Sequence, residues 1–147
     1  MMVMTRLKIE IPGKCIDTFF IPVRITDLNY GNHVGNDAMV AIIHEARVQF
    51  LQKHNCSEFD VFGTALIMRE LQVEYKNESF YGDILRVKIY AGGISGAGFD
   101  LFYSLSVVRN EIAVNIATAK TGMVCFNYEK RKIERVPDDL RKILEAH

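Results

Sequence analysis

One segment of unusual apolar character constrains the fold more than any other feature of the sequence. Between Asn36 and Leu51 the apolar residues fall on every side of a helix: Met39, Val40, Ile42, Ile43, Ala46, Val48, Phe50 and Leu51. Asn36 is a candidate N-cap, because its side chain can accept a hydrogen bond from a free amide of the first turn. Asp37 adds negative charge where the helix dipole favours it. A helix that is apolar all round is normally buried, so we predict a buried helix that runs from Asn36 to about His54.

The segments around this helix have the pattern of strands. Alternating apolar residues predict strands over 16–26, 64–76, 84–91, 99–108 and 112–126. Pro22 lacks an amide donor, which indicates a sheet edge or a bulge in the first strand. The parity of the apolar positions slips within the second strand, which predicts a bulge at Arg69-Glu70. Residues 109–111 have the length of a tight hairpin turn, and Pro137 opens a short helix over 138–147.

This order of elements favours one fold class. A run of strands that follows a single helix is typical of an α+β protein with an antiparallel sheet, and not of a doubly wound fold. Several of the predicted strands have about 10 residues, whereas about 5–6 is usual. Such long strands suit a sheet that curls, so we predict about five strands wrapped around the one long helix. At 147 residues the chain is expected to form a single domain over 1–147.

Composition excludes several classes of function. The 18 basic and 18 acidic residues balance, and no basic stripe with interleaved aromatic residues indicates a nucleic-acid partner. The three cysteines are too few and too scattered for a disulfide framework or a metal site. The N-terminus lacks the apolar region of a signal peptide, and no segment approaches the roughly 18 apolar residues of a membrane span. We therefore expect a cytoplasmic protein without a metal, a redox cofactor or a membrane span.

Residues 23–47, VRITDLNYGNHVGNDAMVAIIHEAR, resemble the signature of the 4-hydroxybenzoyl-CoA and acyl-CoA thioesterases. That signature runs approximately R-x-x-D-x-D-x-x-G-H-V-N-N and continues into a helix with E-A-R. The resemblance implies the hotdog fold, in which an antiparallel sheet curls around one long helix. It implies hydrolysis of an acyl-CoA or acyl-carrier-protein thioester to a carboxylic acid and a free thiol, with coenzyme A as part of the substrate and no separate cofactor. It also implies a homodimer or homotetramer with an active site shared between protomers.

The candidate catalytic residues follow from this signature position by position. Asp27 matches the first Asp, His33 the His, and Glu45 the Glu of the helix motif. Asn29 stands where the family often has its catalytic carboxylate, and an amide cannot serve as a general base or a nucleophile. We therefore expect His33 or Glu45 to supply the base, while Asn29 positions water and Asp27 orients His33 or the loop.

The candidate substrate-binding residues lie at the start of the predicted helix. Asn36 matches the second Asn of the signature, and Gly35 stands where the first Asn usually sits. The free amides around Gly35, Asn36 and Asp37 are expected to bind the substrate and stabilise its oxyanion. Glycine at 35 would let the substrate approach the backbone closely. Glu45, set among Ile42 and other apolar residues, is expected to be desolvated, which raises the pKa of a carboxyl group and suits acid/base chemistry.

Structural interpretations of the same residues stay open. Glu45 and Arg47 could form an ion pair with a structural or subunit-interface role, because buried charges are normally paired. Asp27 could only cap the tight turn through Gly31, and His33 could be an ordinary hydrogen-bonded loop residue.

Two other functions are also open. The presence of Asn29 at the catalytic position favours a non-catalytic protein that binds acyl-CoA or an acyl carrier. The order Asp27-x-Asn29 followed by a His resembles the D-x-N-P-x-H loop of hotdog enoyl-CoA hydratases and dehydratases, although here Tyr30 replaces the proline and His33 lies one residue further on.

Overall fold

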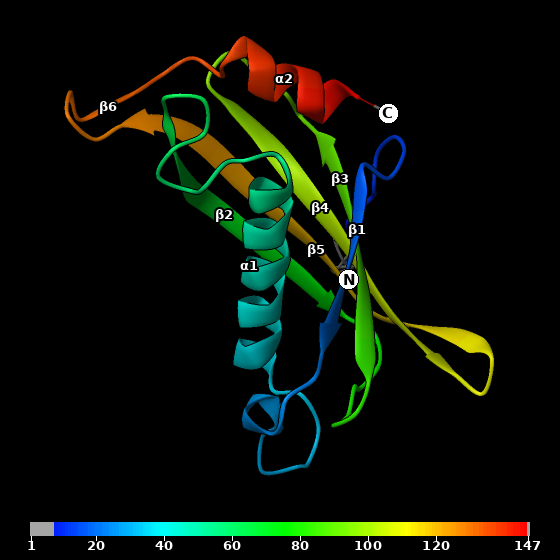
Figure 1. The fold of residues 1–147 in the computed structure, drawn as a ribbon. Coiled ribbons are helices and arrows are strands. Elements are labelled where there is room, and N and C mark those ends of the chain that lie inside the picture. The colour runs from blue at the N-terminus through cyan, green and yellow to red at the C-terminus, as the bar shows by residue number, and fades with distance from the viewer. Residues whose placement is uncertain (1–7, 147) are drawn as a thin grey trace, which may run out of the picture.

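The computed structural model describes residues 8–146, which form one curled antiparallel sheet, a long helix on its concave side and a short C-terminal helix (Figure 1). The strands are β1 (Asp17–Pro22), β2 (Ala65–Tyr75), β3 (Ile84–Gly92), β4 (Gly98–Arg109), β5 (Ile112–Asn127) and β6 (Lys132–Ile133). The helices are the 3₁₀ turn η1 (Ile25–Asp27), α1 (Asn36–Lys53) and α2 (Asp138–Glu145).

The sheet has the order β1-β3-β4-β5-β2, and every neighbouring pair is antiparallel. The predicted α+β hotdog fold, with its sheet wrapped around α1, is therefore confirmed. A two-residue strand, β6, pairs with the end of β5. The sequence did not predict β6, because two residues are too few to show a period.

Two local features of the strands agree with their sequence signals. The register between β2 and β5 shifts between Met68 and Glu70, which confirms the predicted bulge. Asn110 and Glu111 connect β4 to β5 with φ angles of 50° and 65°. A two-residue hairpin turn with positive φ at both positions matches the twist of the strands that flank it, so the predicted tight turn is also confirmed.

Strand β1 is an edge strand, as Pro22 indicated, but it ends earlier than predicted. The chain leaves the sheet after Pro22 and forms the 3₁₀ turn instead of continuing to residue 26. The reason is local: the Asp27 carboxylate accepts a hydrogen bond from the Arg24 amide at 2.8 Å, which closes this turn. Ile25 is consequently 66% exposed and does not extend the apolar face of β1.

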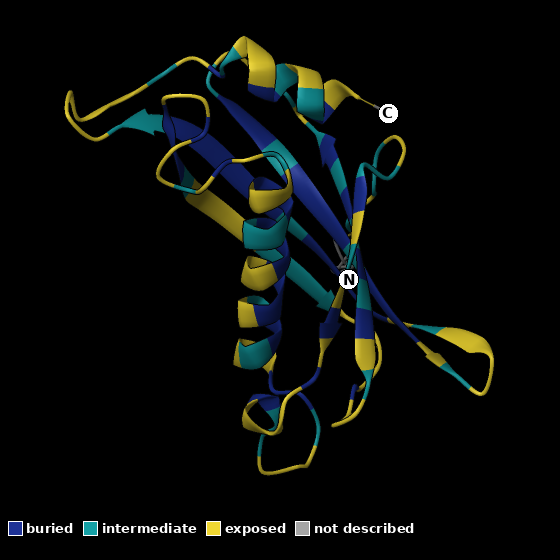
Figure 2. Cartoon of the chain, in the orientation of Figure 1, coloured by how far each residue is buried: buried dark blue, intermediate teal, exposed yellow. Residues whose placement is uncertain are grey.

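Helix α1 forms the centre of the curl, as predicted, but its burial is one-sided (Figure 2). The buried side chains are Met39, Ile42, Ile43, Ala46, Arg47, Phe50 and Leu51. Asp37, Ala41, His44 and Glu45 lie on the opposite side and are exposed. The concave sheet covers only one face of the helix, so the apolar residues Val40 and Val48 remain half-buried.

The first residue of α1 corrects a prediction. Gly35 is the N-cap, and Asn36 is already the first helical residue, so the N-cap role predicted for Asn36 is wrong. Backbone hydrogen bonds fix this boundary. The amide of Gly35 donates to the Asp27 carbonyl at 3.1 Å, and the first helical bond runs from the Met39 amide to the Gly35 carbonyl at 3.0 Å.

Candidate functional site

The loop before α1 is held in place by its neighbours on both sides. The Asn29 amide donates to the His33 carbonyl at 2.9 Å, which closes the loop on itself. The Val34 amide donates to the carbonyl of Ser79 at 2.9 Å, which ties the loop to the connector between β2 and β3. The loop therefore presents its side chains from a fixed backbone at the amino end of α1.

Asp27 anchors this loop through Arg24. Its side chain is buried, and it accepts hydrogen bonds from the Arg24 amide at 2.8 Å and from the Arg24 guanidinium at 3.2 Å. Both interactions close the 3₁₀ turn, so Asp27 caps this turn and not the one through Gly31. No hydrogen bond joins Asp27 to His33 among the residues that the structure describes. Asp27 thus holds the start of the loop through its contacts with Arg24.

Helix α1 starts with free amides. Its N-cap residue, Gly35, has no side chain that could cap, and the described residues offer no acceptor to the amides of Asn36, Asp37 and Ala38. Unpaired amides at a helix N-terminus, together with the positive end of the helix dipole, bind anionic groups. A methyl group on Gly35 would lie 2.7 Å from Asp37 Oδ1, so only glycine fits here without moving that side chain.

The side chains of Asn29 and His33 both lie close to Gly31. A methyl group built on Gly31 would lie 3.3 Å from Asn29 Oδ1 and 3.2 Å from His33 Nε2. Asn29 Oδ1 also accepts a hydrogen bond from the Gly31 amide at 2.9 Å, which fixes the orientation of its side chain. The residue at the usual catalytic position of the family signature therefore lies next to the histidine of the same signature.

The proton on the His33 ring is assigned by its hydrogen bond. Nδ1 lies 3.2 Å from the carbonyl oxygen of Val34, and a carbonyl can only accept. Nδ1 must therefore carry the hydrogen in the neutral ring, which leaves Nε2 free to accept a proton. A carboxylate oxygen of Glu78 lies 3.8 Å from Nε2.

His33 lines a cavity of about 200 Å³ at the start of α1, together with Val34, Asn36, Met39, Tyr75, Lys76, Asn77, Glu78 and Ser79. The Tyr75 hydroxyl donates to the Asn36 carbonyl at 3.0 Å. Burial, and to a smaller extent the charge of Asp37, raises the pKa of Tyr75, so its hydroxyl remains a donor at neutral pH. Ser79 is part of a turn signal in the sequence, and it reaches this cavity through the contact of its carbonyl with Val34, 45 positions earlier.

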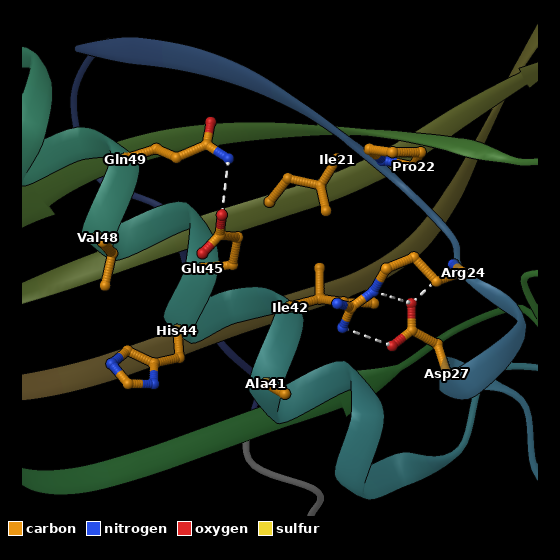
Figure 3. A pocket seen from close by; sticks show the side chains of 10 residues that line it. All are labelled: Ile21, Pro22, Arg24, Asp27, Ala41, Ile42, His44, Glu45, Val48 and Gln49. Carbon is orange, nitrogen blue, oxygen red and sulfur yellow. Dashed lines mark hydrogen bonds and ion pairs between the residues drawn. The ribbon is translucent and has the colours of Figure 1, made fainter.

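Glu45 lines a different cavity, of about 360 Å³, between β1 and the exposed side of α1 (Figure 3). It shares this cavity with Arg24 and Asp27, and it accepts a hydrogen bond from the Gln49 side chain at 3.2 Å. Glu45 is exposed, so the predicted desolvation is wrong. The reason is that its position faces away from the sheet.

The proposed ion pair between Glu45 and Arg47 is also wrong. Arg47 is buried on the other side of the helix, where its guanidinium lies 3.8 Å from Glu58 and donates to the Tyr103 hydroxyl at 3.4 Å. Two positions apart on a helix, Glu45 and Arg47 do not face each other.

The structure thus divides the predicted site residues into two groups. Asn29, His33, Gly35, Asn36 and Asp37 meet at the amino end of α1, whereas Asp27 and Glu45 face the larger cavity. Within residues 8–146, no three His, Cys, Asp or Glu side chains are arranged to hold a metal ion. Neither helix of this part of the chain is both long and apolar enough to cross a membrane.

Comparison with known proteins gives one family. The model of the thioesterase-like superfamily matches residues 23–144, which include α1, the loop before it and strands β2 to β6. No curated protein matches the chain in sequence.

Solved structures share the fold at low sequence identity. A predicted thioesterase from Bacillus stearothermophilus is 20% identical, with a TM-score of 0.75 over 88% of this chain and 94% of that one. A 1,4-dihydroxy-2-naphthoyl-CoA thioesterase from Synechocystis is also 20% identical, with a TM-score of 0.74 over 88% and 97% of the two chains. A thioesterase-superfamily protein from Jannaschia sp. CCS1 is 14% identical, with a TM-score of 0.77 over 86% and 79%.

Proposed function

The chain belongs to the thioesterase-like superfamily, and from this premise we propose that it hydrolyses acyl thioesters at the amino end of α1. The family supports the predicted thioester hydrolase over a hydratase. The observation that carries the location is the meeting of three unpaired helix amides with His33, whose Nε2 is free to accept a proton.

The proposed reaction uses His33 as the general base. A water molecule loses a proton to His33 Nε2 as its oxygen attacks the thioester carbonyl carbon. The negative charge that develops on the carbonyl oxygen is stabilised by the amides of Asn36 and Asp37 and by the helix dipole. When the carbon–sulfur bond breaks, the proton on Nε2 passes to the thiolate, and the products are a carboxylic acid and a free thiol.

The remaining signature residues take supporting roles in this proposal. Asn29 positions the reacting groups beside His33, since its amide cannot accept the proton itself. Gly35 lets the Asp37 side chain lie close to the backbone at the start of the helix, and Asp27 holds the loop through Arg24. Glu45 has no role in the proposed chemistry, because it lines the other cavity.

We further propose a homodimer or homotetramer in the cytoplasm. Strand β2 is an edge of the sheet and exposes the apolar side chains Met68, Leu71 and Tyr75. An uncovered strand edge with apolar side chains is suited to pairing with a second copy. The substrate class, an acyl-CoA or an acyl-carrier thioester, rests on the family resemblance and on the CoA thioester that the Synechocystis neighbour is named for.

The test is an assay of free-thiol release from acyl-CoAs of varied chain length. We expect turnover by the native protein, a fall of about 100-fold or more in His33→Ala, and little change in Glu45→Gln. Binding of acyl-CoA without thiol release from any substrate would establish a binding protein instead. Hydration of an enoyl-CoA, lost in His33→Ala, would establish a hydratase.

A further inference from the structure

We propose that Glu78 supplies the carboxylate of this site and, together with His33, holds the water that attacks the thioester. This inference rests on the proposed function, and it adds a catalytic residue that lies outside the signature in residues 23–47. Its basis is the contact between the Glu78 carboxylate and His33 Nε2 at 3.8 Å. The signature carries an amide, Asn29, where the family often has a carboxylate, so a carboxylate of this site has to come from another segment.

Glu78 is the carboxylate that shares a cavity with His33. Among the described residues that line this cavity, only Glu78 is acidic, whereas Asp27 and Glu45 line the larger cavity (Figure 3). The side chain of Glu78 is 63% exposed and that of His33 is 30% exposed, so water reaches both. Within the described part of the chain, the Glu78 carboxylate has no ion-pair partner other than His33. It is therefore free to contact a reactant in this cavity.

The two side chains face each other as hydrogen-bond acceptors. The Nδ1 hydrogen of His33 is directed at the Val34 carbonyl, so Nε2 presents its lone pair to Glu78 Oε1. Neither Nε2 of the neutral ring nor an ionised carboxylate can donate, and 3.8 Å exceeds the length of a direct hydrogen bond. A water molecule about 2.8 Å from each atom would donate one hydrogen to Nε2 and the other to Oε1. The arrangement thus suits a bound water.

The same cavity brings this water to the proposed oxyanion donors. Asn36, whose amide is one of those donors, lines the cavity together with His33 and Glu78. The cavity measures about 200 Å³, and a water molecule needs about 30 Å³. There is consequently room for the water beside a thioester carbonyl at the start of α1.

Backbone contacts hold the two segments together. The Ser79 carbonyl, next to Glu78, accepts the amide of Val34, next to His33, at 2.9 Å. The carbonyl of Glu78 itself accepts a hydrogen bond from the Arg109 guanidinium at 3.1 Å. The connector that carries Glu78 is therefore anchored to the loop that carries His33 and to β4, as a residue that positions a reactant requires.

The step leaves the glutamate unmodified. The water oxygen forms the bond to the carbonyl carbon, and one water proton passes to His33 Nε2. The second proton donates to the Glu78 carboxylate throughout and stays on the oxygen, where it becomes the hydroxyl hydrogen of the carboxylic acid. When the carbon–sulfur bond breaks, the sulfur takes the bonding electrons and then the proton from Nε2. A charged acceptor makes this hydrogen bond stronger than a neutral one would.

The experiment compares Glu78→Ala with the control Glu129→Ala in the acyl-CoA assay. Glu129 is an exposed glutamate of the turn between β5 and β6, and it lines none of the cavities described above. We expect kcat of Glu78→Ala to fall about 10-fold or more, with KM within about twofold, because Glu78 contacts the water and not the thioester. The melting temperature should stay near the native value, since exposed ion pairs contribute little to stability. Glu129→Ala should keep the native kcat.

Chemical rescue separates a catalytic role from a structural one. Because Glu78 is exposed, sodium formate can enter the space that Glu78→Ala leaves and supply a carboxylate to the water. Formate should therefore raise the kcat of Glu78→Ala and leave the kcat of the native protein and of Glu129→Ala unchanged.

Three results would overturn the proposal: native kcat in Glu78→Ala, a loss that appears only in KM, or a loss of kcat that formate does not restore. The native protein is assayed in the same series. If it hydrolyses no thioester, the proposed function itself is overturned, whereas an active native protein with an equally active Glu78→Ala overturns only the role of Glu78.

Discussion

Replacement of Asn29 by aspartate is the most direct test of the geometry at the start of α1. Asparagine and aspartate have nearly the same shape, and the oxygen that accepts the Gly31 amide at 2.9 Å is retained. The new oxygen replaces Nδ2, which lies 3.9 Å from the position of a methyl group on Gly35. Asn29→Asp therefore introduces a carboxylate beside the free helix amides with no change in packing.

The effect on stability should be small because two electrostatic contributions oppose each other. A negative charge near a helix N-terminus gains about 0.3–1 kcal/mol. Asp37, whose Oδ1 lies 2.7 Å from the same methyl position, repels the new charge. We expect the free energy of unfolding to stay within about 1 kcal/mol of the native value.

The effect on turnover should be large where His33 is missing. A positioned general base contributes about 10²–10⁴-fold to a rate, so Asn29→Asp in the His33→Ala background should raise kcat by about 100-fold. Thiol release from an acyl-CoA is the assay, and Asn32→Asp, an exposed position in the same loop, is the matched control. If Asn29→Asp rescues no more activity than Asn32→Asp, position 29 does not face the reacting carbonyl and the proposed site is misplaced.

Three further predictions concern stability. Arg47→Met should change the free energy of unfolding, measured by urea titration, by no more than about 1 kcal/mol. The Tyr103 hydroxyl keeps its hydrogen bond to Thr121, and the substitution removes the unpaired Nε of the buried guanidinium. Burial raises the pKa of Cys125 from 9.0 to about 11, so between these pH values the folded state keeps a proton that the unfolded state loses. The free energy of unfolding should therefore fall between pH 9 and 11 by up to about 1.4 kcal/mol per pH unit. A free energy of unfolding that does not change with pH over this range would contradict the prediction. Partial burial opposes ionisation of Asp83, but hydrogen bonds from Arg109 and a backbone amide outweigh it and lower the pKa of this carboxyl group. Ionised Asp83 therefore stabilises the folded state, and this stabilisation should be lost below about pH 4. Thermal melts should show the loss in the native protein and not in Asp83→Asn.

Local signals in the sequence were sufficient for most of the fold. The bulge near Glu70 appears as a slip in apolar parity within one strand, and the turn at Asn110 depends on residues that are adjacent in the chain. The helix and the curled sheet follow from periodicity and strand length. In each case the signal lies in one short stretch of the chain, which a single sequence displays directly.

The errors concern positions that distant contacts decide. Asn36 is a good N-cap by residue type, but the bonds from the Gly35 amide to Asp27 and from Val34 to Ser79 set the helix boundary one residue earlier. The burial of Glu45 depends on which face of α1 the sheet covers. Because both faces carry apolar residues, the sequence does not show which face that is. Ser79 enters the site through a contact between segments that are far apart in sequence, so neither a motif nor a period indicates it.

The separation of the two cavities favours one of the two candidate bases in this chain. A base and the oxyanion donors must both lie about 3 Å from the same reacting group. Glu45 comes nine positions after Asn36, and at a rise of 1.5 Å per residue it lies about 14 Å along the helix from the free amides. His33, by contrast, lines the same cavity as Asn36. Glu45 therefore lies out of reach of a carbonyl that the amides of its own helix hold, so the proposed reaction uses His33, which precedes α1, and not Glu45.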